Sequence, residues 1–125
     1  MLSYDHPGAH STFEAAEAEM RKLIAAGVPP NQLILGLPFY GRDITNRRRT
    51  MSYRDILERY RPDPDVNEVD NVFFNGPGLI RRKTELALKA GLAGVMFWEL
   101  GQDAAGDGSL LKVIRSTVAS RSPAE

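Results

Sequence analysis

The chain has 125 residues, of which 42% are hydrophobic and 26% are charged, as expected for a globular domain with one modest core. Sixteen basic residues balance sixteen acidic ones, so the charge gives no reason to expect nucleic acid or an anionic membrane as a partner. Cysteine is absent, which excludes disulfides and thiolate metal sites, and no apolar run approaches the roughly 18 residues of a membrane span.

The first third of the chain carries one helix signal and one strand signal. Ser11-Thr-Phe-Glu14 has the capping-box pattern, apolar residues then recur at helical spacing, and Gly27 is expected to end the helix. The short apolar run 33–37 is bounded by turn residues and predicts a buried strand. Pro38 and Gly41 are expected to lead from that strand into a loop.

The middle of the chain is more polar. Ser52-Tyr-Arg-Asp55 is a second capping pattern and predicts a short helix that ends near Tyr60. The segment from Asp63 to Asn71 is expected to be a loop. Residues 72–74 are apolar and predict a brief strand across the mouth of a site.

The last third repeats the alternation. Pro77 suits the first turn of a helix that Gly91 ends, and residues 93–98 predict a strand. A final helix is expected over about 109–119, followed by a polar tail at 120–125. Together with Met1–Asp5, which has the pattern of a strand end, this order predicts repeated β/α units with a parallel sheet. Three strands are too few to close an eight-stranded barrel.

Trp98 is the only tryptophan, and it lies where the last predicted strand ends. The carboxyl ends of parallel strands are where ligands bind in α/β folds. The indole is therefore either the floor of a sugar or ring-binding site or a space-filling core residue, and this segment alone leaves both interpretations open.

Three segments resemble motifs of the family 18 glycoside hydrolases, the chitinase-like barrels. Met1-Leu-Ser-Tyr-Asp5 resembles the M-x-Y-D motif, Leu35–Arg42 resembles the seventh-strand motif, and Gly94–Asp103 resembles the eighth-strand motif with its tryptophan. Ile80–Glu85 also fits the helix between those strands. The resemblance implies an α/β fold that is the C-terminal portion, about strands 6 to 8, of a TIM barrel over residues 1–119.

The resemblance also implies a substrate and a binding site. Family 18 enzymes cleave β-1,4-linked N-acetylglucosamine polymers with retention, using the acetamido oxygen of the substrate as the nucleophile. By resemblance, Tyr4 and Asp5 contact the acetamido group or a sugar hydroxyl, and Trp98 stacks beneath the sugar ring. Tyr40 and Arg42 would contact hydroxyls at neighbouring subsites. The substrate-binding set is Tyr4, Asp5, Tyr40, Arg42 and Trp98.

Some of these residues have structural interpretations as well. The Tyr-Asp pair near the amino end could be a solvated terminus, and Arg42 could form an ion pair with Asp43 or Glu99. Glu99 is not expected to be the catalytic acid, because strand alternation directs it away from the face of the preceding tryptophan. Arg47–Arg49 has the pattern of a solvated loop.

No segment of the chain matches the D-x-x-D-x-D-x-E motif that carries the acid of the family. No catalytic residue is therefore predicted, and the chain is expected to be an inactive fragment that begins at the methionine of the M-x-Y-D motif. The alternative is a non-catalytic half-barrel that binds carbohydrate or self-associates, because open sheet edges and an apolar inner face need a second copy or an upstream half-barrel.

No cofactor or metal is expected. Pro7-Gly8 separates His6 from His10, so the two imidazoles cannot share a helix face as zinc ligands. The amino end has no basic region followed by an apolar stretch, and hence no signal peptide pattern, although the family is often secreted. The compartment stays undetermined.

Overall fold

The computed structural model describes residues 1–121 of the chain. Its main sheet contains two parallel strands, β1 (Ile34–Pro38) and β6 (Gly94–Trp98), with Ile34 opposite Gly94 and Pro38 opposite Trp98. A parallel bridge between Leu2 and Gly36 adds the amino-terminal segment on the other side of β1. Three chain segments therefore run side by side in one direction, as the predicted β/α alternation requires.

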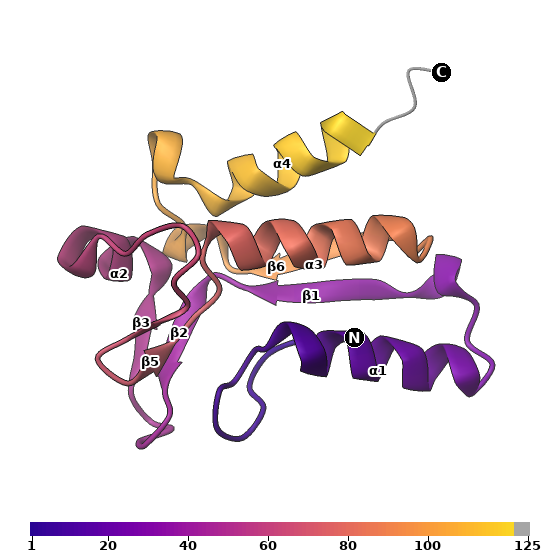
Figure 1. Cartoon of the computed structure of the whole chain (residues 1–125), viewed down its shortest axis with the longest axis horizontal. Coiled ribbons are helices and arrows are strands. Elements are labelled where there is room, and N and C mark those ends of the chain that lie inside the picture. The colour runs from indigo at the N-terminus through magenta and orange to yellow at the C-terminus, as the bar shows by residue number, and fades with distance from the viewer. Residues whose placement is uncertain (122–125) are drawn as a thin grey trace.

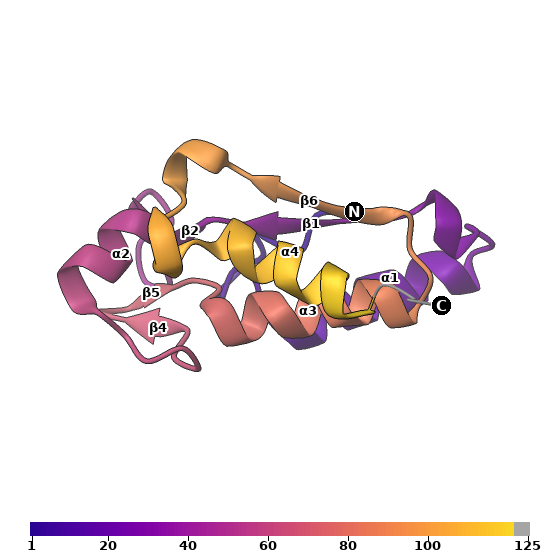
Figure 2. The same ribbon diagram turned by 90° about the horizontal axis from the view of Figure 1, so that it is seen from above.

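Helices α1 (Phe13–Ala25), α3 (Pro77–Lys89) and α4 (Leu110–Arg121) lie on one side of this sheet (Figures 1 and 2). Leu35 and Leu37 point to that side and are completely buried. We call it the covered face of the main sheet. Phe97 also belongs to it and stacks on Phe39, with 4.7 Å between the ring centroids.

The opposite face of the main sheet carries large apolar side chains that remain accessible. Strand alternation places every second residue there, and four of them are exposed by 37–55%: Leu2, Ile34, Met96 and Trp98. Figure 2 shows β6 and β1 at one margin of the fold, with α1, α3 and α4 on the other side. We call this the open face, because nothing within residues 1–121 covers it.

A second, antiparallel sheet lies beyond the carboxyl end of β1 (Figure 1). Its strand order is β3 (Thr50–Ser52), β2 (Tyr40–Asp43), β5 (Val72–Phe73) and β4 (Glu68–Val69). The loop expected after Pro38 is thus wrong, because β2 pairs with strands on both sides. Gly41 permits this packing, since a Cβ atom there would lie 2.5 Å from Val72 Cγ1.

The predicted loop over 63–71 is likewise only partly correct. Glu68 and Val69 form β4, and a two-residue turn connects them to β5. Asp70 and Asn71 have φ values of 48° and 65°, which a type I′ hairpin turn requires and which these residue types tolerate.

The capping residue that the sequence predicts is correct for one helix and wrong for another. Ser52 caps α2 (Tyr53–Tyr60) by accepting from Asp55 N at 3.1 Å, as predicted. In α1, however, the N-cap is Thr12, whose hydroxyl accepts from Ala15 N at 3.1 Å. Ser11 does not cap the helix because its side chain points into a buried polar cluster described below.

The carboxyl-terminal helix is longer than expected. Asp103 fixes its start by accepting from Leu110 N at 2.7 Å and from Leu111 N at 3.1 Å, the usual role of a carboxylate at a helix amino end. The helix continues through Arg121, so residues 120 and 121 are not a tail. Residues 122–125 of the predicted tail lie outside the described part. No helix in residues 1–121 is long and apolar enough to cross a bilayer.

Candidate functional site

A pocket opens where the parallel segments end, on the side of the second sheet. Seven residues line it: Tyr4, Asp5, Tyr40, Arg42, Thr50, Trp98 and Gln102. All five residues predicted to contact substrate are therefore gathered in one place, although they come from three separate stretches of sequence. Their convergence follows from the parallel register, which brings the strand ends to one edge of the sheet.

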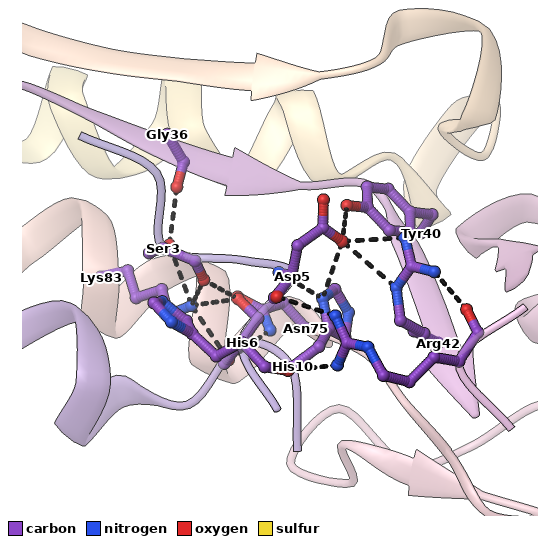
Figure 3. Close-up of polar contacts among 11 residues, drawn as sticks. Ser3, Asp5, His6, His10, Gly36, Tyr40, Arg42, Asn75 and Lys83 are labelled. Atoms are coloured by element: carbon purple, nitrogen blue, oxygen red, sulfur yellow. Dashed lines mark hydrogen bonds and ion pairs between the residues drawn. The ribbon is translucent and has the colours of Figure 1, made fainter. Parts of the chain in front are cut away.

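Asp5 is the centre of the polar contacts (Figure 3). Its Oδ1 atom accepts from the Tyr40 hydroxyl at 2.6 Å and from Arg42 at 2.9 and 3.2 Å. No group in residues 1–121 hydrogen-bonds its second oxygen, Oδ2. One carboxylate oxygen is thus fully used inside the protein, and the other is left for a ligand.

These contacts also set the protonation states. Burial alone would raise the pKa of Asp5, but the hydrogen bonds from Tyr40 and Arg42 and the positive charge of Arg42 bring this pKa below its ordinary value. Burial, and then the negative charge of Asp5, raise the pKa of Tyr4. Burial, and then the hydrogen bond to Asp5 and its negative charge, raise the pKa of Tyr40. At neutral pH the pocket therefore contains a carboxylate, a guanidinium and two protonated phenols.

Trp98 is 55% exposed, so the interpretation of this residue as a core tryptophan is wrong. Its backbone oxygen accepts from Phe39 N at 2.6 Å, which fixes the end of β6 against the strand exit of β1. The neighbouring residue Phe97 faces the core, so alternation leaves the indole on the open side of the sheet. A flat apolar surface beside charged groups is the kind of surface on which sugar rings stack.

The Tyr-Asp pair is not a solvated terminus either. Tyr4 is only 9% exposed, and its ring packs edge-on against Tyr40 with 5.9 Å between the centroids. His10, which the sequence did not single out for this site, stacks on the other side of Tyr40 at 5.2 Å. Its Nδ1 atom accepts from Asp5 N at 3.1 Å. Burial lowers the pKa of His10 to about 4, so the imidazole is neutral at physiological pH.

The arginines also differ from their expected surroundings. Arg42 pairs with Asp5 rather than with Asp43, which binds Arg49 at 2.9 Å. Glu99 is exposed and does not line the pocket. Arg47 donates to the backbone oxygens of Asp5 and His6, both at 2.9 Å. The run 47–49 contains an exposed turn at Arg47 and Arg48, as the solvated-loop interpretation predicts, but Arg47 also braces the pocket wall.

Counting back from Tyr4 also corrects the motif assignment. The spacing of M-x-Y-D puts Leu2, not Met1, in the methionine position, so this chain departs from the motif there. Leu2 forms the parallel bridge to Gly36 through its backbone, and its side chain lies on the open face. The start of the chain therefore does not coincide with the methionine of the motif.

Two pocket residues escaped the sequence analysis. Thr50 begins β3, and Gln102 ends a short 3-10 turn after β6. Neither lies in a recognisable pattern, and only the folding of the second sheet brings Thr50 to the pocket. Within residues 1–121 no group of three or more histidine, aspartate or glutamate side chains is arranged to hold a metal ion.

A parallel α/β sheet with helices outside and a polar pocket at its strand ends is the arrangement found in part of a (β/α) barrel. Residues 2–103 match the model of the glycosyl hydrolases family 18, and the chain belongs to this family.

Three relatives illustrate the match. Chitinase 1 of Aphanocladium album is 23% identical over 158 residues, covering 89% of this chain and 37% of that protein. The family 18 chitinase ChiB from the chitin utilization locus of Flavobacterium johnsoniae is 31% identical with a TM-score of 0.84, covering 94% of this chain and 41% of that one. A plant class V chitinase mutant from Cycas revoluta, in complex with (GlcNAc)3, is 24% identical with a TM-score of 0.75, covering 92% and 44%.

The chain thus spans less than half the length of these relatives, and it matches a portion of their barrel. The open face of the main sheet agrees with this partial match, because a complete barrel would enclose that face.

Proposed function

We propose that this chain forms the sugar-binding floor of a chitinase-like hydrolase, built from about strands 6 to 8 of the barrel, and that its ligand is a chain of β-1,4-linked N-acetylglucosamine. The observation that carries the proposal is the convergence of an exposed indole, Trp98, with the hydrogen-bonded Asp5, Tyr40 and Arg42 in one pocket.

Each side chain is assigned a role in sugar binding from the atoms that it leaves accessible to a ligand. Trp98 offers its flat face to the C–H surface of a pyranose ring. Asp5 Oδ2 is a charged acceptor suited to the acetamido N–H, and the Tyr4 hydroxyl, kept protonated by its raised pKa, is a donor for the acetamido oxygen. Together they would orient that oxygen toward the anomeric carbon, the step that substrate-assisted retaining hydrolysis needs.

The pocket holds and orients the substrate but does not supply the acid. Proton donation to the leaving group is assigned to a D-x-x-D-x-D-x-E segment outside these 125 residues. The 125-residue chain is accordingly proposed to bind chitooligosaccharides and to cleave none.

A fluorescence titration with (GlcNAc)3 tests this proposal, because Trp98 is the only indole in the chain. We expect a saturable change in emission that Asp5→Asn weakens, together with no release of shorter sugars over hours. Asp107→Asn is the matched control, since Asp107 is fully exposed and does not line the pocket. Turnover by the wild-type chain, or no emission change at millimolar sugar, would refute it.

A second candidate function, a non-catalytic half-barrel that self-associates, is favoured by the open face alone. Leu2, Ile34 and Met96 are accessible there, and a second copy could bury them. Sedimentation velocity separates the two proposals: a dimer that Met96→Lys converts to a monomer supports self-association, whereas a monomer at all concentrations argues against it.

A further inference from the structure

Lys83, on α3, is a fully buried charged side chain that the pocket chemistry above does not use. Its exposed fraction is 0%, and it lies on the helix face that also buries Ile80 and Ala87. Lysine is almost never buried in this way unless it is paired. No carboxylate in residues 1–121 lies within ion-pair distance of it.

Its hydrogen-bond partners are instead four oxygen atoms of two residues, Ser3 and Ser11. All four oxygens accept from the ammonium group of Lys83 (Figure 3). Lys83 Nζ lies 2.6 Å from Ser11 Oγ, 3.0 Å from Ser11 O, 3.2 Å from Ser3 Oγ and 3.3 Å from Ser3 O. The hydroxyl protons are directed elsewhere, because Ser3 Oγ donates to Gly36 O at 2.6 Å and Ser11 Oγ donates to Ser3 O. A cage made only of acceptors fits an ammonium group, which has three donors and no acceptor.

The two carbonyls do not need this lysine for their hydrogen bonds. Ser11 O also accepts from Asn75 Nδ2 at 2.9 Å, and Ser3 O also accepts from the Ser11 hydroxyl. Burial lowers the pKa of Lys83 to about 7, opposed in part by the negative charge of Glu14, so the fold bears a desolvation cost for the charge. The hydrogen-bonding needs of the two backbone oxygens therefore do not explain why a lysine is buried at this position.

The positions of Ser3 and Ser11 in the chain explain why a lysine is buried here. Ser3 immediately precedes Tyr4, and Ser11 immediately follows His10. A single ammonium therefore ties together both ends of the segment Tyr4–His10. Asp5 within that segment has φ of 66°, a left-handed conformation that aspartate tolerates but that most non-glycine residues avoid, so the contacts around the segment help to keep it.

We propose that Lys83 is a positioning residue of the pocket: by joining Ser3 to Ser11, it closes the segment that carries Tyr4 and Asp5 and holds both in their binding geometry. The proposal rests on sugar binding at this pocket, but the geometry of Asp5 is observable without sugar. Deprotonation of Lys83 removes one donor and the charge, so it should loosen Asp5 as the pH rises.

Substitution by methionine tests the proposal, since it keeps the length and removes the ammonium. We expect Lys83→Met to weaken (GlcNAc)3 binding at least tenfold while the free energy of unfolding is unchanged or higher. Lys89→Met is the matched control, because Lys89 is an exposed residue on the same helix. Unchanged affinity in folded Lys83→Met would overturn the proposal.

Chemical rescue distinguishes the effect of the Lys83 ammonium on sugar binding from the effect of its side-chain packing. The chain contains no cysteine, so Lys83→Cys is the one alkylation site when the unfolded variant is treated with 2-bromoethylamine. After refolding, the aminoethylated side chain restores an ammonium at nearly the length of lysine. We expect it to recover the affinity that Lys83→Cys loses, and a refolded product as weak as Lys83→Cys would contradict the assigned role.

A measurement on the wild type covers the cases in which a variant does not fold or sugar does not bind. Carbon-13 spectra would follow Lys83 Cε and the Asp5 carboxylate carbon as the pH is raised from 6. The charged or titratable groups that act on Lys83 are Glu14 on α1 and His10, and His10 stays neutral in this range because its pKa is about 4.

We expect the Asp5 carbon to shift with the midpoint of Lys83, and Lys83→Met to abolish that shift. An Asp5 signal that does not respond while Lys83 titrates would overturn the positioning role. If the wild type binds no (GlcNAc)3, the proposed function fails and this titration alone decides the role of Lys83.

Discussion

The two faces of the main sheet differ in how deeply their side chains are buried. On β1, Leu35 and Leu37 are completely buried under the helices, whereas Ile34, on the same strand, is 49% exposed on the open face. At the strand ends the open side also carries Trp98 and the pocket. The covered face therefore supplies the stability of the chain, and the open face leaves apolar side chains and the pocket accessible.

The largest expected effect separates the faces directly. Leu35→Ala should lower the free energy of unfolding by about 2–5 kcal/mol because it leaves a cavity, whereas Ile34→Ala should cost about 0.5 kcal/mol or less. Urea unfolding followed by circular dichroism measures both. Equal losses would mean that the open face is packed in solution, as in a self-associated form.

His10, which is buried against Tyr40, gives a pH effect. The pKa of His10 is about 4 in the folded chain against 6.5 for an ordinary histidine, so the unfolded chain binds the proton first. Lowering the pH from about 6.5 to about 4 should therefore reduce the free energy of unfolding, by on the order of 3 kcal/mol. His10→Phe keeps a ring against Tyr40 and cannot titrate. A pH profile that is the same in the variant would contradict this assignment.

On the open side, the carboxylate should matter more than the indole. Asp5→Asn should weaken (GlcNAc)3 binding about ten- to hundredfold, because a hydrogen bond to a charged group is worth about 1.5–3 kcal/mol. Isothermal titration calorimetry measures the affinity, and urea unfolding checks that the variant is folded. A loss of stability larger than the loss of affinity would make Asp5 a structural residue.

The smallest predicted loss is at the tryptophan. Trp98→Ala should weaken the same binding about two- to tenfold, since a stacking contact beyond simple burial contributes about 0.5–1.5 kcal/mol. Met96→Ala on the same face is the control and should leave affinity unchanged. Calorimetry is again the measurement because the variant lacks the fluorophore. Matching losses in both variants would point to a change in the whole face instead of a stacking contact.

The sequence predicts the covered face well and the second sheet poorly, for physical reasons. Helical spacing and capping residues identify α1 and α3, and an apolar run identifies β1 and β6, because these signals are local. Strand β2 has no such signal: Tyr40–Asp43 is a strand only because it pairs with β3 and with β5, about 30 residues away. Short strands of this kind depend on tertiary contacts.

The pocket residues divide in the same way. The resemblance to family 18 motifs predicts Tyr4, Asp5 and Trp98, and the structure brings them together. Arg47 and Lys83 escape prediction because charged side chains in a run or on a helix are usually solvated. Their hydrogen bonds to backbone oxygens form only when distant segments meet, and of the two side chains Lys83 alone is buried.

The central claim, that the strand ends form a sugar-binding floor, has one direct test. Trp98 contributes the single indole N–H signal of the chain in a ¹H–¹⁵N spectrum, so a titration with (GlcNAc)3 reports on this pocket without ambiguity. The proposed function predicts a saturable shift of that signal that Asp5→Asn weakens and Asp107→Asn does not. An indole signal that stays unchanged at millimolar sugar would contradict it.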